Sequence, residues 1–93
     1  MGYPNSRCLL TPVPKTLYSS DHEHLVSMLR SLREKSGLRQ TELAGKLARP
    51  QSFVSKVESG QRRLDLIELR AWCEALDADL VTFVRKWLKA SNH

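Results

Sequence analysis

One side of the segment from Gln51 to Ser59 carries polar side chains that suit hydrogen bonding. With a helical rotation of about 100° per residue, these side chains fall within an arc of about 140°: Gln51, Ser52, Ser55, Lys56 and Ser59. The apolar side chains of Phe53, Val54 and Val57 fall on the opposite side. Glutamine can pair with adenine, lysine can donate to guanine, and serine suits either base. The pattern therefore predicts hydrogen bonding to base edges.

Positive charge surrounds this segment. Between Arg39 and Arg63 there are six basic residues and two acids, a net charge of +4 out of the chain's +5. The basic residues are Arg39, Lys46, Arg49, Lys56, Arg62 and Arg63. An ordinary solvated surface is the alternative interpretation, but such surfaces usually carry paired Glu and Lys side chains. The local charge favours a phosphate backbone as the ligand.

A helix as short as this one is not stable alone, so its apolar stripe must dock on other helices. Apolar spacing predicts helices over residues 20–35, 40–47, 66–76 and 80–89, in addition to 50–60. Capping residues mark three of the starts: Ser20 with Glu23, Asp65 with Glu68, and Asp79. Pro50 should open the third helix, and Gly37 and Gly60 should follow helix ends. With no strand pattern, the predicted fold class is all-α.

Length and composition exclude several classes of protein. The chain has 93 residues, a mass of 10.6 kDa and a sequence pI near 9.6, which indicates one domain and a polyanionic partner. No apolar run approaches the roughly 18 residues of a membrane span, and residues 1–16 lack the pattern of a signal peptide. Cys8 and Cys73 match no zinc or redox spacing, so we expect reduced thiols in a cytoplasmic protein.

The ends of the chain differ from its centre. Residues 1–19 contain Pro4, Pro12 and Pro14 without a sustained period, which predicts an N-terminal arm. Residues 20–90 form the predicted domain, and residues 91–93 form a tail. His22 and His24 point about 200° apart on a helix, so we expect no metal site and no cofactor.

Two segments carry a family resemblance. The first runs from Gly37 to Leu47 (GLRQTELAGKL), and the second runs from Gln51 to Gly60 (QSFVSKVESG). Together with the turn from Leu76 to Leu80, they resemble the helix-turn-helix of lambda-repressor-like, XRE-type transcriptional regulators. The resemblance covers about residues 25–84 and places the helix-turn-helix unit at about residues 40–59. It implies a compact five-helix domain whose third helix enters the major groove.

The resemblance also implies roles for individual residues. The implied base contacts are Gln51, Ser52, Ser55 and Lys56. The implied phosphate contacts are Gln40, Arg62 and Arg63, and the positive charge near the helix ends adds Arg39 and Arg49. Arg33 and Glu58 correspond to an ion pair that is common in the family, and we expect this pair to be structural.

Three residues depart from the family pattern. Arg39 replaces the usual Ser or Thr cap of the second helix, at a cost of about 1 kcal/mol. Pro50 replaces the usual cap of the third helix. Asp77 occupies the usual glycine of the turn before the fifth helix, a conformation that aspartate tolerates less readily than glycine. None of the three is expected to prevent folding.

The fifth predicted helix carries more apolar surface than one intramolecular contact needs. We therefore expect a homodimer through Phe83, Val84, Trp87 and Leu88, with a possible contribution from the arm. The alternative is that the arm covers this surface within one chain, through Leu9, Leu10, Val13 or Tyr18. The fourth predicted helix has one apolar arc, which we expect to face the core: Leu66, Leu69, Trp72, Cys73 and Leu76.

The function that the sequence favours is sequence-specific binding of double-stranded DNA by a homodimeric repressor with a palindromic operator. The sequence contains no nucleophile-elbow motif, no P-loop motif and no metal-ligand spacing, so we expect no enzyme activity. The alternative is an antitoxin or adaptor whose main partner is a protein and whose DNA binding serves autoregulation. The arm would then be the element that binds the partner.

Overall fold

The computed structural model describes residues 15–91, and within this range every regular element is an α-helix. The helices are α2 (Lys15–Lys35), α3 (Gln40–Leu47), α4 (Gln51–Glu58), α5 (Leu66–Ala75) and α6 (Leu80–Ser91). The prediction of an all-α, five-helix domain is confirmed. The part of the predicted arm in residues 1–14 and the tail residues 92–93 lie outside the described residues.

The first helix begins earlier than predicted. We expected it to start at Ser20, but α2 starts at Lys15. Pro14 is the last proline before it, and residues 15–19 contain no glycine or proline that would stop a helix. The spacing of Ser20 and Glu23 also occurs inside helices, so this pair alone did not define the boundary. Residues 15–19, assigned to the arm from the sequence, therefore belong to α2.

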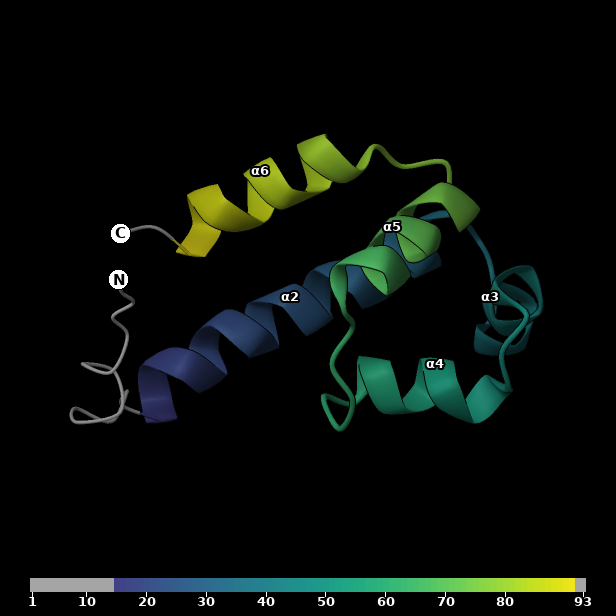
Figure 1. Ribbon diagram of the computed structural model, residues 1–93, viewed down its shortest axis with the longest axis horizontal. Coiled ribbons are helices and arrows are strands. Elements are labelled where there is room, and N and C mark those ends of the chain that lie inside the picture. Colours follow the sequence, from purple (N-terminus) through teal and green to yellow (C-terminus); the bar gives the residue numbers. More distant parts are fainter. Residues whose placement is uncertain (1–14, 92–93) are drawn as a thin grey trace, which may run out of the picture.

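The long helix α2 lies between α6 and α4 (Figure 1). Helix α6 packs along one side of α2, whereas α4 packs on the other side and also contacts α3. Helix α5 contacts both α3 and α6. The core is built from α2 to α6: Leu29, Leu43, Ala44, Phe53, Val54, Val57, Trp72, Cys73, Leu76 and Phe83. The expected core position of Trp72 is confirmed, because its side chain is fully buried.

Several turns require a left-handed backbone. Gly37 and Gly60 follow α2 and α4 with φ values of 77° and 84°, as their predicted places at helix ends require. Asp77 has φ 57°, so it does occupy a position that suits glycine. Ala48, which caps the end of α3, has φ 56°, and nothing in the sequence predicted this strained alanine. A non-glycine residue in this conformation costs about 1 kcal/mol.

The predicted cap of α5 is confirmed, but the predicted burial of its first apolar residue is not. The Asp65 carboxylate accepts a hydrogen bond from the Glu68 backbone N–H at 2.7 Å, and Glu68 accepts one from the Asp65 N–H at 3.0 Å. Leu66, which we expected on the inward arc, is 69% exposed. A side chain in the first turn of a helix can extend past the end of the packed surface, and Leu66 does so.

Candidate nucleic-acid interface

Helix α4 is held by its apolar side. Phe53, Val54 and Val57 are 8%, 0% and 1% exposed, as the helical pattern predicted. On the other side, Gln51, Ser52 and Lys56 are exposed, and Ser55 is half-buried. The packing therefore presents a polar helix face to the outside on a rigid support, which is the geometry that base recognition requires.

The N-terminus of α4 is defined by proline. Pro50 is the N-cap, with φ −63° and ψ 153°, and no side chain caps the helix. We expected Pro50 inside the first turn, so its place is one residue earlier. Its extended ψ is a conformation that proline readily adopts. Arg49 and Pro50 thus lead directly into the exposed first turn that contains Gln51 and Ser52.

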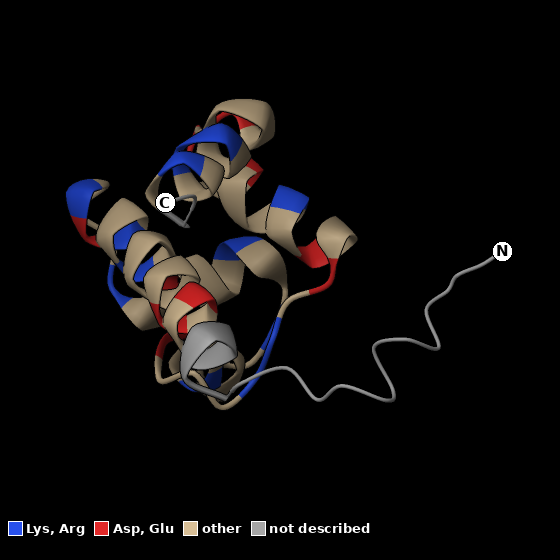
Figure 2. Ribbon diagram, turned by 90° about the vertical axis from the view of Figure 1, so that its left-hand side faces the viewer, with Lys and Arg blue, Asp and Glu red and all other residues tan. Residues whose placement is uncertain are grey.

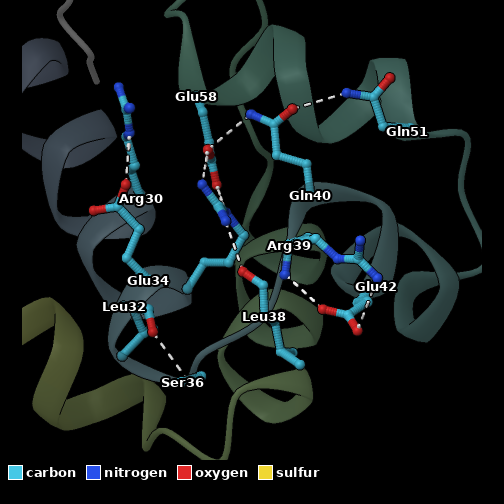
Figure 3. Close-up of polar contacts among 11 residues, drawn as sticks. Arg30, Leu32, Glu34, Ser36, Leu38, Arg39, Gln40, Glu42, Gln51 and Glu58 are labelled. Carbon is cyan, nitrogen blue, oxygen red and sulfur yellow. Dashed lines mark hydrogen bonds and ion pairs between the residues drawn. The ribbon is translucent and has the colours of Figure 1, made fainter.

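A chain of hydrogen bonds connects the polar face of α4 to the interior (Figure 3). The Gln51 Nε2 donates to Gln40 Oε1 at 2.8 Å, and the Gln40 Nε2 donates to Glu58 Oε1 at 3.1 Å. Gln40 is the first residue of α3. The contact holds two residues with predicted DNA roles against each other, although they lie on different helices.

Glu58 in turn is bound by Arg33 of α2. The Arg33 Nε and Nη2 atoms donate to the two carboxylate oxygens of Glu58 at 2.6 and 2.9 Å. Arg33 also donates to the Leu38 carbonyl at 2.7 Å. The hydrogen bond to Glu58 raises the pKa of Arg33, although burial opposes the charged form. The pair that the resemblance implied therefore connects α2, α4 and the loop before α3.

A second charged group forms around Phe53. The guanidinium carbons of Arg49 and Arg62 lie 4.3 and 4.9 Å from the centre of the Phe53 ring, within the range of a cation–π contact. Both arginines also bind Glu68, each through an Nη2 atom 2.9 Å from Glu68 Oε2. Arg62 makes a further hydrogen bond to Glu68 Oε1 at 3.1 Å. We name these residues, Arg49, Phe53, Arg62 and Glu68, the arginine cluster.

Glu68 is strongly acidic in this cluster. The hydrogen bond from the Asp65 backbone N–H, together with those from Arg62 and Arg49, lowers the pKa of Glu68 to about 2. The sequence pattern indicated Glu68 only as a capping residue. Its position on α5, far from Arg49 along the chain, gave no signal that it would meet two arginines.

The other basic candidates lie apart from the cluster. Arg39 precedes α3, its side chain is 81% exposed, and it lies 3.6 Å from Glu42. The Arg39 backbone N–H donates to Glu42 at 2.7 Å, which lowers the pKa of Glu42. Arg63 is exposed in the loop after α4. Basic residues are also present on α6, in the upper part of Figure 2, so positive charge is not confined to the α3–α4 region.

The predicted dimer surface on α6 needs a correction. Phe83 is only 6% exposed because it packs in the core, so it was wrong as an interface residue. Trp87 is half-buried, and its indole N–H donates to the Asp21 carbonyl at 3.1 Å. Val81 and Leu88 are 59% and 52% exposed. They line a shallow apolar hollow of about 320 Å³ with Leu80, Val84 and Arg85.

Residues 15–91 contain no group of three or more His, Cys, Asp or Glu side chains that could hold a metal ion. Among the helices of the same range, none is long and apolar enough to cross a membrane. Burial raises the pKa of the Cys73 thiol to about 11, as expected for an unreactive core cysteine.

Known proteins resemble this arrangement. Residues 24–83 match the helix-turn-helix domain family. The chain is similar to the structure of an XRE-family like protein from Pseudomonas syringae pv. tomato str. DC3000, with 38% identity and a TM-score of 0.77 over 85% of this chain and 95% of that chain. Two structures of the clp gene regulator ClgR from Corynebacterium glutamicum are 25% identical, with TM-scores of 0.68 and 0.67. Each match covers 76% of this chain, and they cover 76% and 91% of the regulator chains. No curated protein sequence shows a significant match.

Proposed function

The chain belongs to the XRE-type helix-turn-helix family and is a non-enzymatic, DNA-binding transcriptional regulator. From this premise we propose that it is a homodimeric repressor of a palindromic operator. The observation that carries the proposal is the orientation of α4. Its apolar residues are buried and its polar face is exposed, so the face can enter a major groove without any rearrangement of the core.

Gln51 is the leading candidate for base recognition. Pairing with adenine requires an amide N–H for N7 and the amide oxygen for N6. The hydrogen bond to Gln40 uses one amide hydrogen of Gln51, and a glutamine amide has two. The second hydrogen and the oxygen are therefore available for adenine, while Gln40 fixes the plane of the amide.

The remaining base contacts come from the same face of α4. Ser52 lies beside Gln51 in the exposed first turn, and Ser55 and Lys56 lie one turn further along. Lys56 is suited to guanine O6 and N7, and the serines suit either base. We propose that these residues contribute to sequence preference, with Gln51 and Lys56 as the main determinants.

The proposed phosphate contacts lie on both sides of this face. Gln40 begins α3, where backbone N–H groups favour an anion. Arg39 precedes Gln40, Arg49 precedes α4, and Arg62 and Arg63 follow α4. These residues supply affinity and fix the position of the domain on the duplex, but they carry no sequence information themselves.

The proposed dimer uses the exposed apolar side of α6. Val81 and Leu88, together with Leu80 and Val84, supply the contact, while Phe83 and Trp87 support it from inside the monomer. In this proposal the twofold symmetry of the dimer matches that of the palindromic site, and each half-site binds one copy of α4. Bound as a dimer, the protein would repress transcription by excluding polymerase.

Selection of bound duplexes from a random DNA pool tests this proposal. We expect a palindromic consensus with half-sites about one helical turn apart. The double variant Gln51→Ala with Lys56→Ala should lose the preference for the consensus and keep weak binding that salt abolishes. The matched double variant Glu74→Ala with Lys89→Ala changes exposed residues on α5 and α6 and should keep the preference. An unchanged preference in the α4 variant would contradict the assigned base contacts.

A further inference from the structure

We propose that Glu68 acts as an intramolecular substitute for DNA phosphate and thereby limits the affinity that Arg49 and Arg62 give to DNA binding. This inference rests on the proposed function, because it concerns the phosphate contacts of the same surface. The geometry of the arginine cluster carries it.

The carboxylate occupies the donors that a phosphate would use. Arg62 presents two nitrogens to the two oxygens of Glu68 at 3.1 and 2.9 Å, which is the bidentate arrangement that arginine also forms with phosphate. Arg49 donates to the same Glu68 oxygen at 2.9 Å. One anion therefore already lies between the two guanidinium groups.

Both arginines are also held in place by α4 itself. Their guanidinium groups lie over the ring of Phe53, which is buried in α4. Arg49 and Arg62 remain 41% and 39% exposed, whereas Glu68 is 15% exposed. A phosphate that approaches α4 would thus meet two fixed arginines with a carboxylate behind them.

The charge of the cluster is lower than its arginines suggest. Two guanidinium groups and one carboxylate carry a net charge of +1, because Glu68, with a pKa of about 2, stays ionised at neutral pH. The Arg49 and Arg62 donors would exchange one anion for another when a phosphate replaces Glu68. An exchange of this kind yields less free energy than a first ion pair does.

Weaker phosphate binding has a consequence for selectivity. Phosphate contacts add affinity to every DNA sequence, whereas base contacts add it only to the operator. Glu68 lowers the shared part and leaves the Gln51 and Lys56 contacts untouched. Glu68 therefore lowers the affinity for non-operator DNA, to the extent that it weakens the phosphate contacts.

The variant Glu68→Gln tests this inference. Glutamine keeps the size of the side chain and an oxygen that can accept the Asp65 N–H, so the cap of α5 is preserved. We expect tighter binding to operator and to random duplex alike, with the slope of log affinity against log salt steeper by about 1. At about 0.15 M salt, this difference in slope corresponds to about fivefold higher affinity than that of the wild type.

The control variant is Glu74→Gln. It removes the same charge from the same helix, and Glu74 contacts Arg70 at 3.8 Å rather than the arginine cluster. We expect its affinity and salt slope to stay close to those of the wild type. Equal effects of the two variants would overturn the inference, because the effect would then be that of net charge alone.

A double-mutant cycle identifies the groups through which Glu68 acts. The change of Arg49 and Arg62 to glutamine should weaken DNA binding more in the Glu68→Gln background than in the wild type. An equal or smaller loss in that background, or weaker binding by Glu68→Gln alone, would overturn the inference. Thermal unfolding of each variant verifies that the domain is folded. If the wild type bound no duplex even at low salt, the proposed function itself would fail, which is a different result from any of these.

Discussion

Two groups of arginine and glutamate form contacts at α4, and they differ mainly in their exposure to solvent. In the first, the side chains of Arg33 and Glu58 are 10% and 3% exposed. In the second, Arg49 and Arg62 are about 40% exposed around a more buried Glu68. A buried pair must stay intact because an unpaired charge in the interior is costly, whereas a half-exposed group can exchange partners with water, ions or DNA. The first group thus supports the fold, and the second is suited to binding.

Loss of the buried pair should have the largest effect. The variant Glu58→Gln leaves Arg33 charged and without its carboxylate partner, which should lower the free energy of unfolding by about 3 kcal/mol. The variant Glu68→Gln should lower it by less than about 1 kcal/mol. Chemical denaturation of both variants measures the difference. Equal losses of stability would show that the two groups do not divide the structural and binding roles as described.

Loss of the Gln40 side chain, which connects Gln51 on the polar face of α4 to the buried Glu58, should have an intermediate effect. The variant Gln40→Ala removes both the partner of Gln51 and the connection to Glu58. We expect about tenfold weaker binding to the selected operator, which corresponds to about 1.4 kcal/mol. Binding to random duplex should fall less. Fluorescence anisotropy with the two duplexes measures this ratio, and an unchanged ratio would argue against positioning of Gln51 by Gln40.

The smallest expected effect is the acid dependence of stability. The pKa of Glu68 in the folded protein is about 2, below its ordinary value of 4.5, so the unfolded chain binds more protons between these values. The contribution of Glu68 is therefore complete above about pH 4.5 and is lost as the pH falls through about 2. Because the arginines are exposed, we expect it to stay below about 1 kcal/mol. Urea denaturation at pH 6 and at pH 3 should show a smaller pH difference for Glu68→Gln than for the wild type.

Much of the fold could be predicted from local sequence patterns. The burial of Phe53, Val54 and Val57 followed from their spacing, because helical rotation places them on one side whatever they pack against. The cap of Asp65 with Glu68 followed from a four-residue pattern. The start of α2 did not, because Ser20 and Glu23 fit the interior of a helix as well as its beginning.

The apolar surface of α6 was harder to divide between core and exterior. The sequence showed that Phe83, Val84, Trp87 and Leu88 are all on a wide apolar arc, but it did not show which part of the arc α2 covers. Packing against α2 and α5 buries Phe83 and leaves Leu88 more than half exposed. The width of an apolar arc thus predicts the presence of an apolar surface, but packing decides its limits.

The sequence by itself determined which side of α4 is polar and how many helices support it, because both depend on periodicity within short segments. The tertiary structure decided which polar groups meet. Gln40 and Glu58 are 18 residues apart, and Arg49 and Glu68 are 19 apart. Such contacts depend on how α3, α4 and α5 pack, and side-chain hydrogen bonds form only where that packing brings a donor within about 3 Å of an acceptor.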